Sequence, residues 1–268
     1  MFNVIQWGRR PQRNGIQRVL ALTVVAALLA GGARLARADE RAFTFTYEAT
    51  TMPAGSWELE NWVTWATHKR EDHAFDQIDF RHELEYGVTD HFQLSVYLSD
   101  WGYQDGASAE RAGTKWQDAA VEGIYSLTDP VADPLGIAIY QEVKVGDEVV
   151  ESESKLLLEK KIGPFIIAWN GIFEAEWEGK GYTAHNAIFG QALGVSYQVH
   201  PRFLVGAEAT QEAEYGNWAH WEDHGVNMGP NASYRAKSWW VTVTPLFQVT
   251  DVQDQPDFQT RLVIGVNF

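Results

Sequence analysis

The fold is decided by residues 79–99, which read DFRHELEYGVTDHFQLSVYLS. Up to Tyr86, apolar and charged residues mostly alternate, which is the period of a β-strand with two different faces. Residues 87–90, GVTD, then reverse the chain. The return strand places four apolar residues on one face: Phe92, Leu94, Val96 and Leu98. The stretch therefore predicts an antiparallel hairpin with one apolar side, as in the strands of a membrane barrel.

The same alternation recurs along the whole chain after residue 55. It predicts twelve strands, at residues 56–67, 75–87, 91–101, 116–127, 136–146, 153–162, 165–177, 185–199, 202–215, 225–235, 239–250 and 257–268. Short reversals alternate with longer polar stretches, at residues 68–74, 101–115, 146–153, 178–184, 216–224 and 251–256. Bacterial barrels have this alternation of tight periplasmic turns and longer extracellular loops, and an even strand count. We expect an all-β, single antiparallel transmembrane β-barrel; a soluble periplasmic sandwich is the alternative.

The first 38 residues have the order of a secretory signal peptide. Four arginines precede an apolar run at residues 19–30, and Ala36-Arg37-Ala38 stands ahead of Asp39. The run is shorter than the roughly 20 residues that a membrane-spanning helix needs. We expect cleavage between Ala38 and Asp39 after export by the general secretion route. Residues 39–55 are assigned to a periplasmic N-terminal segment, with entry into the barrel as the alternative, and residues 56–268 to the outer-membrane barrel.

The charge balance limits the partners of the mature protein. The chain has 21 basic and 36 acidic residues and no cysteine. The leader contains basic residues and no acidic ones, so its removal makes the protein still more acidic. Such a surplus disfavours nucleic acid and favours small cations or neutral solutes. The lack of cysteine excludes thiol catalysis, and we expect neither a cofactor nor a metal site.

The last strand closes the pattern at the C-terminus. One face carries Leu262, Ile264, Val266 and Phe268, while Val263 is an apolar exception on the other face. A terminal aromatic residue after such alternation resembles the closing strand of outer-membrane proteins. That resemblance implies recognition by the barrel-assembly machinery and insertion among outer-membrane lipids.

Three stretches carry a more specific resemblance: residues 51–60 (TMPAGSWELE), 80–90 (FRHELEYGVTD) and 229–235 (GPNASYR). They resemble an uncharacterised family of Gram-negative outer-membrane barrels akin to the phenol-degradation-pathway (MetA-type) channels. The shared motifs are turns and strand starts. The resemblance implies the fold and the outer membrane as location, and it brings no activity with it.

If the apolar face meets lipid, the opposite face lines the lumen, and there acidic residues predominate. We expect the lumen to be lined by Glu58, Glu60, Asp79, Arg81, Glu83, Glu85, Asp118, Glu122, Glu142, Lys144, Glu174, Glu176, Glu208, Glu212 and Glu214. Carboxylates in a narrow channel concentrate cations, which predicts passive passage of cations or small neutral solutes. The alternative is a salt-bridged plug, because twelve strands lie between barrels that side chains fill and barrels that hold water.

Two other functions compete with a channel. A barrel lipid hydrolase needs a serine and a histidine on the lipid-facing side, and His82 lies on the apolar face. No Gly-x-Ser-x-Gly motif accompanies it, so we expect no enzyme. A binding or structural barrel without conductance is suggested by Trp218 and Trp221, which stand close together in one predicted outer loop.

Overall fold

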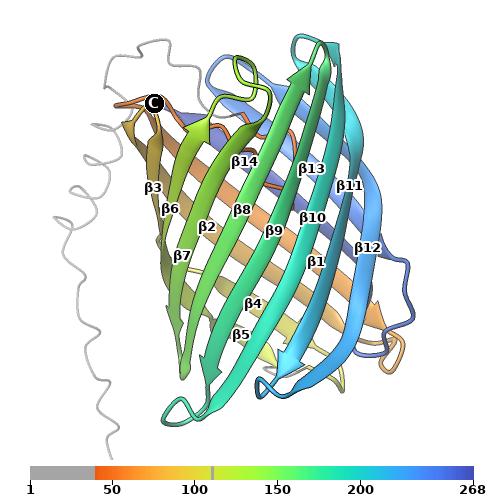
Figure 1. Ribbon diagram of the computed structural model, residues 1–268. Coiled ribbons are helices and arrows are strands. Elements are labelled where there is room, and N and C mark those ends of the chain that lie inside the picture. The colour runs from red at the N-terminus through yellow and green to blue at the C-terminus, as the bar shows by residue number, and fades with distance from the viewer. Residues whose placement is uncertain (1–39, 110–111) are drawn as a thin grey trace, which may run out of the picture. The chain divides into compact units, whose positions relative to one another are not determined.

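The computed structural model describes residues 40–109 and 112–268, and its regular structure consists of β-strands (Figure 1). The strand segments are β1 (Trp57–Lys69), β2 (Asp76–Thr89), β3 (Phe92–Tyr97), β4 (Trp101–Asp105), β5 (Gly113–Trp116), β6 (Asp118–Thr128), β7 (Gly136–Gly146), β8 (Val149–Ile162), β9 (Phe165–Glu178), β10 (Ala184–His200), β11 (Phe203–Gly216), β12 (His220–Arg235), β13 (Trp239–Gln248) and β14 (Pro256–Asn267). No helix in the described part is long and apolar enough to cross a membrane.

The sheet closes on itself because β1 pairs with β14 as well as with β2, antiparallel in both cases. We call each full-length strand of the barrel wall a stave, and two of the staves consist of two strand segments each. β3 and β4 both pair with β2, and between them residues 98–100 face residues 81 and 82, which leaves one extra residue, a β-bulge. β5 and β6 form the next stave. The result is a closed barrel of twelve antiparallel strands, which confirms the predicted fold class; the predicted signal peptide and its cleavage site, Ala38 and Asp39, lie outside the described residues.

Three of the predicted loops are largely strand instead. Most of residues 101–115 forms the β4–β5 hairpin, only residues 147 and 148 separate β7 from β8, and β12 already begins at His220. Polar residues in these stretches suggested loops. In a barrel, however, polar side chains can face the lumen while the backbone groups pair between strands.

The outer face carries rings of aromatic side chains toward both ends of the strands. We call the end with connections at residues 90–91, 129–135, 163–164, 201–202 and 236–238 the turn end, and the opposite end the loop end. At the turn end Trp57 contacts Tyr86 and Phe165 contacts Tyr197. At the loop end the contacting aromatic residues include Trp65, Phe258, Phe80 and Trp101. Such girdles mark the two membrane interfaces of outer-membrane barrels.

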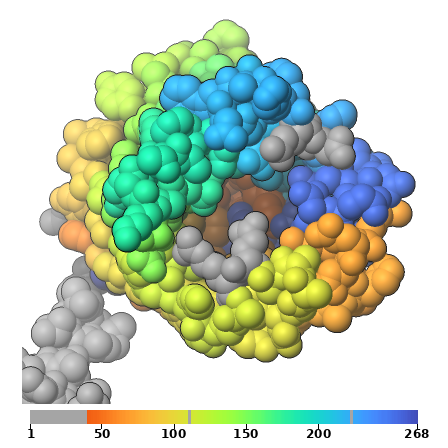
Figure 2. Space-filling model, turned by 90° about the horizontal axis from the view of Figure 1, so that it is seen from below, coloured from red at the N-terminus to blue at the C-terminus, as the bar shows by residue number. Residues whose placement is uncertain are grey.

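The largest departure from the predicted organisation concerns residues 40–56, which we call the plug segment. It lies inside the barrel, with Ala42, Phe43, Thr44, Ala49 and Met52 all buried. The expectation of a segment in the periplasm is therefore wrong for these residues, and the alternative of entry into the barrel is correct. Figure 2 looks into the loop end, and at the depth of its opening the chain has the orange colour of this part of the sequence. The reason is polar complementarity: strand side chains of the wall bind backbone groups of the segment, as described below.

Gly87 shows how the sequence makes room for the plug segment. The backbone at Gly87 exchanges hydrogen bonds with the chain at Gly55 (N to O, 2.8 Å) and Ser56 (3.1 Å). A Cβ atom at position 87 would lie 2.1 Å from the carbonyl oxygen of Pro53. Only glycine allows this close approach of two backbones. The reversal predicted at residues 87–90 is accordingly shifted: β2 continues to Thr89 and the chain turns at residues 90–91.

Candidate functional site

Glu208 of β11 holds the innermost part of the plug segment. Its Oε1 accepts hydrogen bonds from the backbone N–H of Thr44 (2.9 Å) and from the hydroxyl of Thr244 (2.5 Å). Its Oε2 accepts from the backbone N–H groups of Phe45 (2.8 Å) and Thr46 (2.9 Å). Three successive N–H groups thus surround one carboxylate, an arrangement that favours a bound anion. The plug segment therefore supplies the hydrogen bonds that the buried carboxylate of Glu208 needs, and the carboxylate in turn holds the plug segment in place.

Other wall residues bind the rest of the segment in chain order. The Asn170 side chain accepts from the N–H of Tyr47 (2.7 Å) and donates to its carbonyl (2.9 Å), as a neighbouring strand would. Glu159 accepts from the N–H of Ala49 (2.9 Å). The Gln93 side chain accepts from the N–H of Met52 (3.1 Å). These bonds satisfy backbone groups that burial would otherwise leave unpaired, at a cost of about 1–3 kcal/mol for each group.

Apolar packing adds to these hydrogen bonds in two places. Phe43 and Ala42 pack with Ile166, Ala168 and Leu204 of the wall. Tyr47 and Ala49 belong to a second cluster, together with Trp62, Ile124, Ala138, Tyr140, Leu157, Trp240 and Val263. This explains the apolar exception at Val263 in the last strand: the residue faces the lumen, where Tyr47 and Trp62 share its cluster.

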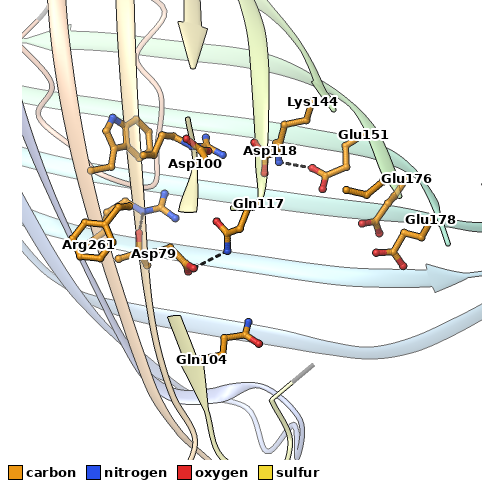
Figure 3. A pocket seen from close by; sticks show the side chains of 15 residues that line it. Asp79, Asp100, Gln104, Gln117, Asp118, Lys144, Glu151, Glu176, Glu178 and Arg261 are labelled. Carbon is orange, nitrogen blue, oxygen red and sulfur yellow. Dashed lines mark hydrogen bonds and ion pairs between the residues drawn. The ribbon is translucent and has the colours of Figure 1, made fainter. Parts of the chain in front are cut away.

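An open vestibule lies between the plug segment and the loop end (Figure 3). It has a volume of about 340 Å³, and Arg261 and Trp62 belong to its lining. The guanidinium of Arg261 lies 4.1 Å from the ring centre of Phe45, so the plug lies directly beneath the vestibule. Two polar contacts organise its wall: Gln117 donates to Asp79 (2.9 Å), and Lys144 forms an ion pair with Glu151.

The structure distributes the predicted lumen residues over several regions of the inner face. Around the plug lie the buried carboxylates Glu58, Glu60, Glu83, Glu85, Glu122, Glu142 and Glu208. In the vestibule lie Asp79, Arg81, Asp118, Lys144 and Glu176. A further pocket at the loop end contains Glu212 and Glu214, and Glu174 lies opposite Glu153 in the register of β8 and β9. The residues come from all around the barrel and do not form a single cluster.

Sequence reasoning missed the neutral residues that bind the plug segment. Besides Asn170 and Gln93, these are Asn231, which donates to the carbonyl of Ala42 (2.6 Å), and Thr242, which donates to that of Arg41 (2.7 Å). The sequence criterion for lumen residues was charge, which does not find uncharged amides and hydroxyls. An available signal was the group of amides and threonines on the lumen face near the turn end, whose side chains can donate to and accept from a backbone.

His82 is paired with a residue of the neighbouring strand. On the outer face its Nδ1 lies 2.9 Å from Oδ1 of Asn61, the residue opposite in the register of β1 and β2. In the described part of the chain no hydrogen bond joins His82 to a serine side chain. The pair instead allows two polar side chains on this face to satisfy each other.

At the loop end, Asp72 joins two neighbouring connections, and this suggests a test of the rim. Its carboxylate accepts from the backbone N–H of Ser108 (2.9 Å) and of Ala74 (3.1 Å), and these bonds hold the pKa of Asp72 below its usual value. A lowered pKa gives stabilisation that is present above the ordinary carboxyl pKa and is lost as pH falls through the lowered one. Asp72→Asn is expected to cause several-fold faster proteolysis near residues 105–109 at neutral pH.

Wild type should reach the same rate of cleavage only in acid, as Asp72 becomes protonated, as read by an acid-active protease and mass spectrometry. Asp254→Asn, in another connection at the loop end, is the control. Equal cleavage of Asp72→Asn and wild type at every pH would contradict the role assigned to Asp72.

Comparison with known proteins agrees with this architecture. The model of a family described as "Family of unknown function (DUF6662)" matches residues 35–158 and 173–261. A COG4313 outer membrane channel from Pseudomonas putida F1 has a similar structure, with a TM-score of 0.62 at 13% identity over 84% of this chain and 100% of that one. The NanC porin gives a TM-score of 0.54 at 8% identity over 79% of this chain and 100% of that one. No curated protein is similar in sequence. The expected resemblance to outer-membrane channels is thus confirmed at the level of the fold.

Proposed function

The chain belongs to the DUF6662 family of unknown function, and from that premise we propose that it is an outer-membrane channel for cations or small neutral solutes, closed by its plug segment. The turn end faces the periplasm in bacterial barrels, and the loop end faces the exterior. Solutes then enter at the vestibule. Displacement of the plug segment gives them a path to the periplasm.

The observation that supports the proposal is the charge of the external mouth. The vestibule is lined by six acidic and three basic side chains. The second pocket at the loop end has four acidic side chains, and no basic one occurs among the described residues that line it. A surplus of fixed negative charge in a confined opening raises the local concentration of cations and repels anions.

The path of the plug segment fits a removable closure. Glu40 lies near Arg235, at the periplasmic end of β12, and the segment leaves the barrel beside Gly87, at the periplasmic end of β2. Its deepest residues, around Phe45, lie between these two points in the sequence. The segment is therefore a loop inserted from one end. It can withdraw toward the periplasm without threading a chain end through the barrel.

Reversal potentials in planar bilayers test the proposed selectivity. Replacing Glu151, Glu176 and Glu178 with glutamine leaves equal numbers of acidic and basic side chains in the vestibule. The permeability ratio of potassium to chloride is expected to fall from clearly above one to near one. Asp147→Asn, at the exposed tip of the β7–β8 turn, controls for general surface charge. A channel that prefers chloride, or a ratio that the triple variant leaves unchanged, contradicts the proposal.

A binding or structural barrel without conductance is the second candidate, and the well-bonded plug segment favours it. It predicts silent bilayers for wild type and also for variants whose plug is released. A channel predicts current in the released variants. The two functions are therefore separated by the same recordings.

A further inference from the structure

Carboxylates of like charge lie directly opposite each other where β1, β2, β3 and β6 meet the plug segment. In the register of β1 and β2, Glu58 faces Glu85 and Glu60 faces Glu83. Like charges in directly opposed positions destabilise a pair of strands. Because all four side chains point into the barrel and are buried, water does not screen them. One ion pair, between Glu60 and Arg41 of the plug segment (3.3 Å), offsets part of this charge, and the rest has to be compensated in another way.

Glu83, Glu85 and Glu122 converge more closely than register alone requires. One carboxylate oxygen from each lies within 4.8 Å of the other two, and Glu85 also forms a similar group with Glu58 and Glu60. Ser95 of β3 stands between them on the same inner face, opposite Glu85 on one side and Glu122 on the other. Three converging carboxylates, and a serine at the register position between two of them, thus lie together on the inner face.

The hydrogen bonds of the described residues do not satisfy this group. Glu83 and Ser95 are both 0% exposed, yet neither oxygen of Glu83 nor the hydroxyl of Ser95 has a hydrogen-bond partner in the described part of the chain. Glu208, in contrast, has a donor for each oxygen. A buried carboxylate without donors is costly, and so is a buried hydroxyl. The oxygen atoms of Glu83 and Ser95 are therefore available to coordinate a cation.

We propose that Glu83, Glu85, Glu122 and Ser95 bind a calcium ion. Carboxylate and hydroxyl oxygens are hard ligands, which exclude a preference for the softer transition metals. The three carboxylate oxygens lie within 4.8 Å of one another, close enough for a single calcium ion with Ca–O distances of about 2.4 Å to contact all of them. Calcium also accepts the irregular geometry that carboxylates fixed on different strands impose, whereas magnesium demands a near-ideal octahedron.

The ion ties β2 to β6 across β3, beside the plug segment. A small cavity next to it is lined by Glu85 and Gln93 of the wall and by Arg41 and Tyr47 of the plug. Gln93 binds the backbone of Met52. Calcium therefore fixes the part of the wall against which the plug is seated. The site itself does not depend on the channel function, because it consists of wall residues alone.

Metal content of the refolded full-length mature chain tests the proposal. The protein is refolded into detergent with calcium chloride, desalted into metal-free buffer and analysed by mass spectrometry of the metal. Wild type is expected to retain calcium, and Glu83→Gln to lose it. Glu212→Gln, an inward carboxylate without contact to this group, is expected to retain it. Terbium gives a second readout, because Tyr97 donates a hydrogen bond to Glu122 and its ring can sensitise terbium luminescence that calcium then quenches by displacement.

Ser95→Ala provides a second test of calcium binding in case Glu83→Gln does not fold. Its hydroxyl has no hydrogen-bond partner among residues 40–109 and 112–268, so the barrel should form, while the affinity for calcium falls about tenfold through loss of one ligand. Wild type that retains no calcium above the level of Glu83→Gln overturns the proposal. So does terbium luminescence that Ser95→Ala and Glu83→Gln leave unchanged. Neither result depends on whether the barrel conducts.

Discussion

Glu208→Gln is expected to open the barrel, seen in planar bilayers as a roughly hundredfold increase in the time spent conducting. The glutamine amide has one oxygen where the carboxylate had two. In either orientation its NH₂ group faces backbone N–H donors of the plug, at Thr44 or at Phe45 and Thr46. Donors that face donors lose their hydrogen bonds, each at about 1–3 kcal/mol. A total of about 3 kcal/mol changes the open population by roughly two powers of ten.

Glu212→Gln is the matched control for this prediction. It removes the same charge from the same strand, four residues nearer the loop end, where Glu212 lines the outer pocket. The control should change selectivity slightly and leave the open time unchanged. Equal open times for Glu208→Gln and wild type, with the barrel folded by heat-dependent gel mobility, would show that Glu208 does not hold the plug.

The barrel itself could be predicted from the sequence because its physics is local and periodic. One face of every strand must be apolar for lipid, so Leu94 and Val96 alternate with Gln93 and Ser95, and each predicted strand overlaps a stave of the observed sheet. The break between β3 and β4 could not be predicted in the same way. A bulge inserts one residue without interrupting the outward apolar pattern at Leu98 and Trp101.

The plug segment could not be located from its own residues. Residues 40–56 have no strand period, and their backbone groups bind side chains far along the chain, such as Glu208, Asn170 and Glu159. Contacts of this kind leave no pattern within the segment. The carboxylates such as Glu58, Glu83 and Glu208 are buried on the inner face of the wall. Their use as hydrogen-bond acceptors for the plug depends on that segment, so the sequence suggested an open acidic passage in its place.

Gly194→Ala is expected to release the plug by a steric route that changes no charge. A Cβ atom at position 194 of β10 would lie 2.6 Å from ring atoms of Phe43, well inside van der Waals contact. The wall there is a paired strand, so the ring has to move. Phe43 is fully buried among Ile166, Ala168 and Leu204, and overpacking of such a site costs about 1–3 kcal/mol. Open time should rise roughly tenfold or more.

Gly190→Ala, on the same inward face of β10, is the control, because its Cβ would lie 3.3 Å from Ile172 and meets no plug residue among its nearest described neighbours. The stronger check is rescue. Each single change, Gly194→Ala or Phe43→Leu, should weaken the packing of the plug segment against the wall. Because leucine is smaller than phenylalanine, the double variant should have room for both side chains and should close again. Such a coupling between two positions 151 residues apart requires that they touch. If the two effects simply add, Phe43 does not occupy the position against β10 and the plug is held elsewhere. If closure returns while Glu208→Gln stays open, packing and the carboxylate hold the same segment independently.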